Sequence, residues 1–125
     1  MKFVSKLNAE VYLGLGANLG TPQETFEKSL DIISTFAGVE KVSRLYQSAP
    51  FGFSDQPPFV NAAVRINTTL SPVQLLAKLQ DVEKRLGKKV VRRNGPRIID
   101  LDLLLYASLT LTSKELILPH PGILT

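Results

Sequence analysis

Two aspartates, Asp100 and Asp102, stand at the start of an apolar segment and carry the clearest chemical potential in this sequence. In a β-strand, residues i and i+2 point to the same face, so the two carboxylates should lie side by side. The same alternation sends the apolar residues to the opposite face: Ile99, Leu101, Leu103 and Leu105. Neighbouring carboxylates repel each other unless a cation joins them. Mg²⁺ suits such a pair, because it binds one or two carboxylates and completes its shell with substrate phosphates.

Basic residues crowd the segment just before this pair. No acidic residue lies between Lys84 and Ile99. Within this stretch, seven basic residues occupy fourteen positions: Lys84, Arg85, Lys88, Lys89, Arg92, Arg93 and Arg97. Such a cluster is typical of an anionic partner, namely a nucleoside triphosphate, a nucleic acid or a membrane surface. An Asp-x-Asp pair alone is more often a solvated strand end, and a basic cluster alone can be a solvated loop. Together they favour a metal-dependent site for a phosphorylated nucleotide, because the Arg fork matches phosphate oxygens.

The composition limits the remaining classes. The chain has 125 residues, of which 44% are hydrophobic and 21% charged, with a net charge of +4. We expect residues 1–125 to form a single domain around one core. The absence of cysteine excludes disulfides and thiolate metal sites, and a single histidine argues against a zinc site. No apolar run approaches the roughly 18–20 residues that span a membrane. We therefore predict a cytoplasmic protein.

Hydrophobic periodicity predicts four strands and two helices. The strands cover residues 11–16, 42–46, 59–68 and 98–106. The first helix begins at Thr21-Pro22, in a sequence typical of a capping box, and ends at Gly38. The second begins at Ser71-Pro72 with the same signature and ends at Gly87. Loops occupy residues 47–58 and 87–97, where prolines, glycines or basic residues accumulate.

This β-α-β-β-α-β order predicts an α+β, ferredoxin-like fold, the split βαβ arrangement. Right-handed crossovers then give an antiparallel sheet in the strand order 4-1-3-2, with both helices on one face. The carboxyl end of the first strand therefore meets the beginnings of the third and fourth. We expect residues 16–18 to lie near Phe59 and Asn61, and near the aspartate pair, on the face away from the helices.

Other polar residues have weaker signals. The segment Gly14–Gly20 lacks the glycines of a dinucleotide fingerprint and the Gly-Lys-Ser/Thr of a phosphate loop, so a tight turn explains it, although Asn18 could bind a ligand. Phe59 and Asn61 could stack on and hydrogen-bond a flat heterocycle, or simply line an exposed strand. Gln80 and Glu83, three residues apart on a helix, are most simply solvent-facing.

Several segments together resemble one family, the 6-hydroxymethyl-7,8-dihydropterin pyrophosphokinases of folate synthesis. The matching stretches follow the family's order along the chain: residues 14–20, 46–52, 56–64, 95–102 and 118–121. The resemblance implies transfer of the β,γ-pyrophosphate of ATP to the hydroxymethyl group of the pterin, with release of AMP.

The resemblance also implies roles for residues. Asp100 and Asp102 would hold two Mg²⁺ ions, and Arg97 would act with them in catalysis. ATP would be bound by Gln80, Lys88, Arg93, Arg97 and His120. The pterin would be bound by Ser48, Phe51, Phe59 and Asn61. The turn residue Asn18 would also bind the substrate, and Glu83 would be a supporting acidic residue near the pterin. We expect a monomer that binds these two small molecules, without nucleic acid or membrane.

The sequence also departs from the family. Asn94 stands where many relatives carry Trp, and Lys88 and Lys89 stand where relatives often carry Arg. Relatives usually continue beyond the Pro-His-Pro segment with an aromatic residue over the pterin. We therefore expect a shortened or divergent member with a complete βαββαβ core and a weaker hold on the pterin.

Two alternatives come from other classes. A ferredoxin-like sheet with basic residues 84–97 could bind RNA on its open face, but the central positions there lack stacked aromatics, and the aspartates would repel phosphates. A regulatory ligand-binding domain of the same fold would have no use for an aspartate pair beside an arginine loop.

Overall fold

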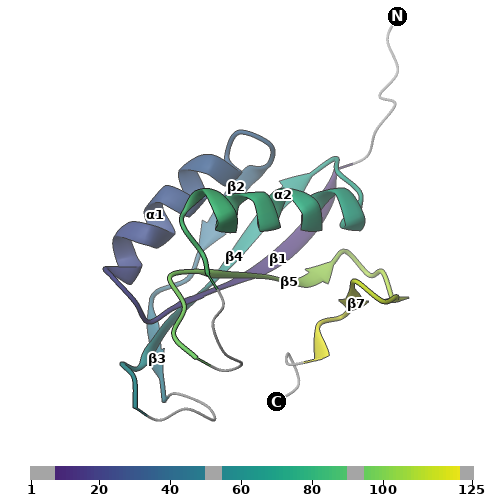
Figure 1. Cartoon of the computed structure of the whole chain (residues 1–125). Coiled ribbons are helices and arrows are strands. Elements are labelled where there is room, and N and C mark those ends of the chain that lie inside the picture. The colour runs from purple at the N-terminus through teal and green to yellow at the C-terminus, as the bar shows by residue number, and fades with distance from the viewer. Residues whose placement is uncertain (1–7, 50–54, 90–94, 122–125) are drawn as a thin grey trace, which may run out of the picture.

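The computed structural model describes residues 8–49, 55–89 and 95–121, and it shows an antiparallel sheet covered on one face by two helices (Figure 1). The main strands are β1 (Ala9–Ala17), β2 (Gly38–Val42), β4 (Phe59–Thr68) and β5 (Asp100–Tyr106). They follow the order β2-β4-β1-β5, and a short strand β3 (Tyr46–Ser48) also pairs with β4. The helices are α1 (Pro22–Ile33) and α2 (Pro72–Arg85). The predicted order of the four long strands is therefore confirmed.

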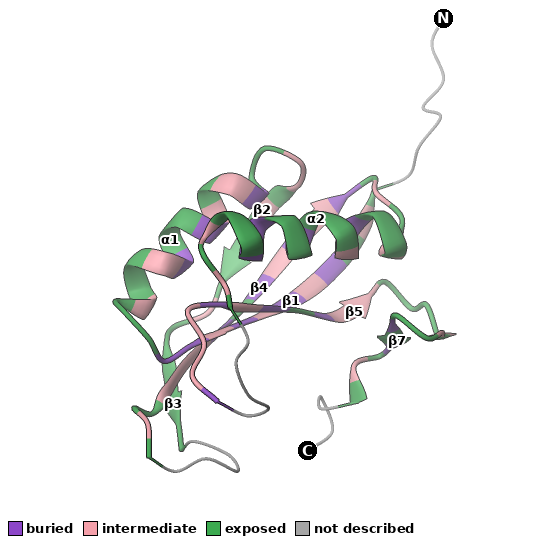
Figure 2. Cartoon of the chain, viewed as in Figure 1, coloured by how far each residue is buried: buried purple, intermediate pink, exposed green. Residues whose placement is uncertain are grey.

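The core lies between the helices and the sheet, where the buried surfaces of both layers face each other (Figure 2). It forms because each strand alternates and each helix carries an apolar stripe. On α2 the buried residues Leu75, Leu79 and Val82 follow the helical period. On the strands, alternate positions are buried: Val11, Leu13, Leu15, Ala62, Val64, Ile66, Leu101 and Leu103. The opposite face of the sheet is left open for residues such as Asn61 and Asp102.

The predicted second strand, 42–46, is wrong. The chain leaves β2 at Val42 and enters β3 only at Tyr46, with both strands paired to β4. The cause is Ser43, whose hydroxyl accepts the Ala63 N–H at 2.8 Å and donates to the Arg44 carbonyl at 2.8 Å. A serine side chain competes in this way with the regular ladder of backbone bonds. The result is a kink between two short edge strands.

The first helix ends earlier than predicted. Its last residue is Ile33, and Gly38 begins β2 instead of ending the helix. The hydroxyls of Ser34 and Thr35 bind the carbonyls of Asp31 and Ile32, both at 2.6 Å, and so take up acceptors of the last turn. Gly87, by contrast, follows the end of α2 with φ of +91°, as expected for a helix stop.

Strand β5 also differs in detail. It begins at Asp100 rather than at residue 98. A bulge opposite Tyr12 and Leu13 also changes its register with β1. Leu13 pairs with Leu103, but Tyr12 pairs with Leu105. Beyond the bulge the faces exchange, so Tyr106, not Leu105, packs against the core. A hairpin that the sequence patterns did not predict follows, formed by β6 (Leu111–Thr112) and β7 (Ile117–Leu118).

The two helix starts give a matched test of stability. The Ser71 hydroxyl accepts a hydrogen bond from the Gln74 N–H, and the Gln74 Oε1 atom accepts one from the Ser71 N–H. The Thr21 side chain, contrary to prediction, makes no capping bond. We expect Ser71→Ala to lower the free energy of unfolding by about 1 kcal/mol. Thr21→Ala should change it by less than about 0.5 kcal/mol. Urea unfolding of both variants measures this, and equal losses would contradict it.

Candidate functional site

The candidate site lies where β1 ends and where β4 and β5 begin. Gly16 pairs with Asn61 on one side and with Asp100 on the other, and the next row of the same face holds Ala63, Gly14 and Asp102. Asn61 and Asp100 are therefore two strand spacings apart, roughly 10 Å. A Cβ added at Gly16 would lie 3.4 Å from the Asn61 Oδ1 atom, so glycine keeps this strip of the open face free of side chains. The predicted convergence of the three segments is confirmed.

The carboxylate of Asp100 is held by a lysine. The Lys88 Nζ atom lies 2.7 Å from Asp100 Oδ1 and 3.0 Å from Glu83 Oε2. The same Glu83 oxygen accepts the N–H of Leu101 at 2.7 Å, on β5 between the two aspartates. Glu83 is thus buried (9% exposed) and joins α2 to β5, rather than facing solvent from the helix surface. The resemblance had assigned Glu83 a supporting position, and these contacts agree with it.

Charge in this cluster is unevenly compensated. Burial raises the pKa of Glu83, although the Leu101 N–H and Lys88 act against this rise. Burial tends to lower the pKa of Lys88, but its bonds to Asp100 and Glu83 outweigh that effect and raise it. Asp102 keeps contact with solvent, yet partial desolvation raises its pKa, and the charge of Asp100 adds to the rise. We conclude that Lys88 stays an ammonium ion among three acidic groups.

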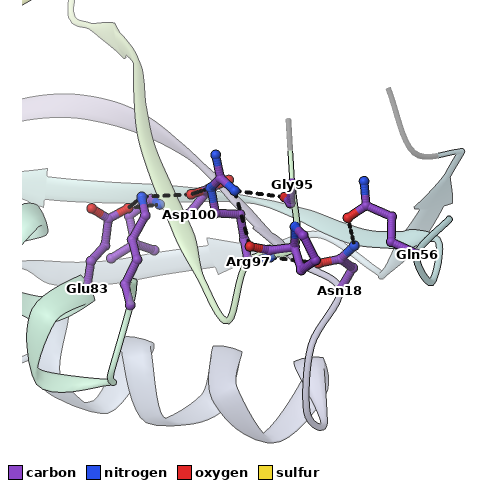
Figure 3. Close-up of polar contacts among 9 residues, drawn as sticks. Asn18, Gln56, Glu83, Gly95, Arg97 and Asp100 are labelled. Atoms are coloured by element: carbon purple, nitrogen blue, oxygen red, sulfur yellow. Dashed lines mark hydrogen bonds and ion pairs between the residues drawn. The ribbon is translucent and has the colours of Figure 1, made fainter. Parts of the chain in front are cut away.

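Arg97 lies beside the same carboxylate but turns back on its own loop. Its Nη1 atom donates to the carbonyls of Gly95 at 2.8 Å and Pro96 at 3.1 Å, and its Nε atom is 3.8 Å from Asp100 Oδ1. Figure 3 shows one row of polar contacts that runs from Glu83 through Asp100 and Arg97 to Asn18 and Gln56. The row joins four segments of the chain, which contain Asn18, Gln56, Glu83 and the pair Arg97 and Asp100.

A second group of side chains surrounds the amide of Asn61. Its Nδ2 atom donates to the Ser48 hydroxyl at 2.8 Å, and Ser48 pairs with Phe59 across β3 and β4. The structure therefore brings Ser48, Phe59 and Asn61 together on one side of Gly16. Asn18 lies close to both groups, but its side chain is buried and bonded to the protein itself.

A cavity of about 270 Å³ adjoins Asp102 and His120, between α2, β5 and the β6–β7 hairpin. Apolar residues from all three elements line it, among them Leu76, Leu103, Leu116 and Ile117, and Lys114 and Glu115 stand at its wall. Its volume is close to the lower end, about 300 Å³, of small-molecule sites. The sequence patterns missed this cavity, since the hairpin that closes it is too short to give a strand signal.

The remaining predicted residues fall into two groups. Gln80 is exposed on α2, three residues before Glu83 and outside the cavity lining. Phe51, Arg93 and Asn94 lie outside the described residues.

Over residues 8–49, 55–89 and 95–121, no group of three or more His, Asp or Glu side chains gathers as a metal site. Within those residues, too, every helix is too short or too polar to cross a membrane.

Comparison with known proteins gives one consistent result. A family model described as 7,8-dihydro-6-hydroxymethylpterin-pyrophosphokinase matches residues 12–125. A protein of Aquifex aeolicus (strain VF5) named 2-amino-4-hydroxy-6-hydroxymethyldihydropteridine pyrophosphokinase is 41% identical over 113 residues, which are 90% of this chain and 71% of the relative. Its namesake in Haemophilus influenzae is 42% identical over 111 residues, 87% of this chain and 69% of the relative.

Longer proteins match as well. The folic acid synthesis protein fol1 of Pneumocystis carinii is 43% identical over 119 residues, which are 94% of this chain but only 16% of the fungal protein. The chain thus spans about 70% of the bacterial relatives and a small part of the fungal one. None of these names supports the nucleic-acid alternative.

The raised pKa of Asp102 predicts a cost in stability. Because the pKa of this carboxyl is higher in the folded state, protonation of Asp102 stabilises the fold. This stabilisation is fully present below the ordinary pKa of 3.8 and is lost as the pH rises through the pKa of the folded state. In chelator-containing buffer, we expect Asp102→Asn to melt at a higher temperature than the original protein at pH 7, with the difference vanishing near pH 3. Thermal unfolding at several pH values measures this, with the exposed Asp81→Asn as control. A lower melting temperature for Asp102→Asn at pH 7 would contradict it.

Proposed function

The chain belongs to the 7,8-dihydro-6-hydroxymethylpterin-pyrophosphokinase family, and from this we propose that it transfers pyrophosphate from ATP to hydroxymethyldihydropterin in folate synthesis. In this reaction the hydroxymethyl oxygen attacks the β-phosphorus of ATP and loses its proton to solvent. The bond from that phosphorus to the oxygen shared with the α-phosphate breaks, and AMP leaves with that oxygen. The observation that carries the proposal is the row Asn61–Gly16–Asp100, which sets an amide for a heterocycle across an open strip from a carboxylate pair.

We propose that the aspartates bind magnesium. Asp100 and Asp102 point to the open face and offer hard oxygen ligands, a donor set that fits one or two Mg²⁺ ions completed by phosphate oxygens. Bound Mg²⁺ would neutralise charge on the triphosphate. Lys88 and Arg97 already lie beside Asp100, where their N–H groups can donate hydrogen bonds to phosphate oxygens. Arg93 is proposed for the same role.

We propose the cavity beside Asp102 as the place of the adenine. Its apolar walls suit a flat base, and His120 at its edge is next to the carboxylate that would hold the metal. Gln80, exposed on α2 outside the cavity lining, stays a proposed ATP contact. Because bound metal would reduce the need for a strong base, the protein would contribute mainly position and charge.

The pterin would lie on the Asn61 side of Gly16. Asn61 can exchange its bond to Ser48 for one to the pterin, and Phe59 offers a ring on the same strand face. Ser48 and Phe51 are proposed to contact the edge of the heterocycle.

We also propose that the chain forms a single ferredoxin-like domain, that it is a monomer and that it is located in the cytoplasm.

The direct test is AMP release from ATP, Mg²⁺ and 6-hydroxymethyl-7,8-dihydropterin. We expect Asp102→Ala to retain the fold and lose turnover, and Arg97→Ala to slow the transfer by roughly 10²-fold or more, as for lost charge stabilisation elsewhere. Calorimetry with a non-hydrolysable ATP analogue should show binding that EDTA abolishes. Turnover by Asp102→Ala would refute the metal assignment, and binding indifferent to EDTA would refute the enzymatic proposal.

The proposed adenine cavity has its own test. Leu76→Trp should fill the cavity and lower the affinity for the ATP analogue by about 10-fold or more, which equals about 1.4 kcal/mol of binding free energy, while pterin binding is retained. Val73→Trp is the matched control, because Val73 is 62% exposed on the same helix, three residues earlier. An unchanged affinity of Leu76→Trp for the analogue would place the base elsewhere.

A further inference from the structure

Asn18 is a buried amide at the junction of three segments. It is 5% exposed, at the turn between β1 and α1. Its Nδ2 atom donates to Gln56 Oε1 at 2.7 Å and to the Pro57 carbonyl at 3.0 Å, just before β4. Its Oδ1 atom accepts the Arg97 N–H at 2.8 Å, just before β5. Both ends of the amide are therefore used within the protein.

Backbone bonds fix the same place independently. The N–H groups of Asn18 and Leu19 both donate to the Arg97 carbonyl, at 3.0 and 3.1 Å. The Asn18 side chain therefore adds one bond to the Arg97 segment, which the backbone bonds already hold. It also forms two bonds to the Gln56–Pro57 segment. Figure 3 shows Asn18 standing between Arg97 and Gln56 in the row of contacts.

These two segments lead directly to the two halves of the proposed site. Gln56 and Pro57 precede Phe59 and Asn61, proposed for the pterin, and Arg97 precedes the carboxylate pair, proposed for the triphosphate. We infer that Asn18 is a positioning residue whose amide fixes the pterin segment relative to Arg97, without touching either substrate. This inference rests on the proposed function and replaces the expectation that Asn18 binds the substrate.

A positioning role has consequences that a direct contact lacks. A shift of about 1 Å between reacting groups can cost roughly 10²-fold in rate. Asn18→Ala should therefore lower the transfer rate at saturating substrates by roughly 10- to 100-fold, while the affinity for the ATP analogue alone changes less than about 3-fold. In an Arg97→Ala background, where the positioned group is gone, Asn18→Ala should lower the rate by less than about 3-fold further.

Amide hydrogen exchange tests the same inference without turnover. In Asn18→Ala the Arg97 N–H loses its acceptor, so its exchange should quicken by about 10-fold or more, while the Leu101 N–H, held by Glu83, stays protected. Asn18→Asp keeps an acceptor for Arg97 but lacks the donor, so Arg97 should stay protected while the rate still falls. Asn67→Ala, an asparagine lost at the far end of β4, is the control with unchanged rate.

The outcomes separate the two levels of the argument. Additive rate losses in the double variant, or unchanged Arg97 exchange in Asn18→Ala, would overturn the positioning role even if the enzyme is active. If the original protein releases no AMP but Asn18→Ala still frees the Arg97 amide, the proposed function fails while the bond itself is verified.

Discussion

Repulsion among carboxylates at the start of β5 is the constraint around which this site is organised. Glu83, Asp100 and Asp102 lie within one small region, where Lys88 forms ion pairs with Glu83 and Asp100, and Arg97 approaches Asp100. Such crowding is tolerated because Lys88 bridges two of the acids and the Leu101 N–H binds one of them. Burial raises the pKa of Asp102, and the neighbouring charge of Asp100 adds to the rise. Perturbed groups of this kind are typical of functional sites.

The antiparallel sheet provides the second condition. Only because β1 runs against both β4 and β5 can its carboxyl end meet the first residues of both neighbours. Gly16 then adds no side chain between Asn61 and Asp100, so these two polar groups face a common space, while the Leu104 side chain packs beside Gly14. The helices cover the other face and bury the core, which leaves the open face free for chemistry. Fold and site thus depend on the same alternation along three strands.

The sequence predicted the features that residue types and periodicity determine. Long alternating segments such as Phe59–Thr68 and the stripe of Leu75, Leu79 and Val82 are strong signals, and from them strand order and the meeting of Asn61, Gly16 and Asp100 followed. Short features failed, because single side chains decide them: the Ser43 hydroxyl splits a strand and Ser34 helps to end a helix. The cavity was missed because its wall is a hairpin of two-residue strands.

Asn18 shows the same limit within the site. An aspartate beside arginines is recognisable by type, since its charge restricts what it can do, but an asparagine can serve a ligand or its own chain equally well. Only its three partners, from segments nearly forty and eighty residues away, distinguish the two roles.

Under the proposed function, the charges at Asp100 would make metal and nucleotide favour each other's binding. A triphosphate brought alone to this place would meet three carboxylates, against which Lys88 and Arg97 offer too little positive charge. A divalent cation brought alone finds only two protein carboxylates, one of them already held by Lys88. Together, the cation supplies the missing charge and the phosphates supply the missing ligands, while Lys88 keeps Glu83 as a partner when it gives up Asp100. Under the proposed function, this arrangement of acids and bases would favour a metal-bound polyphosphate over either of its parts.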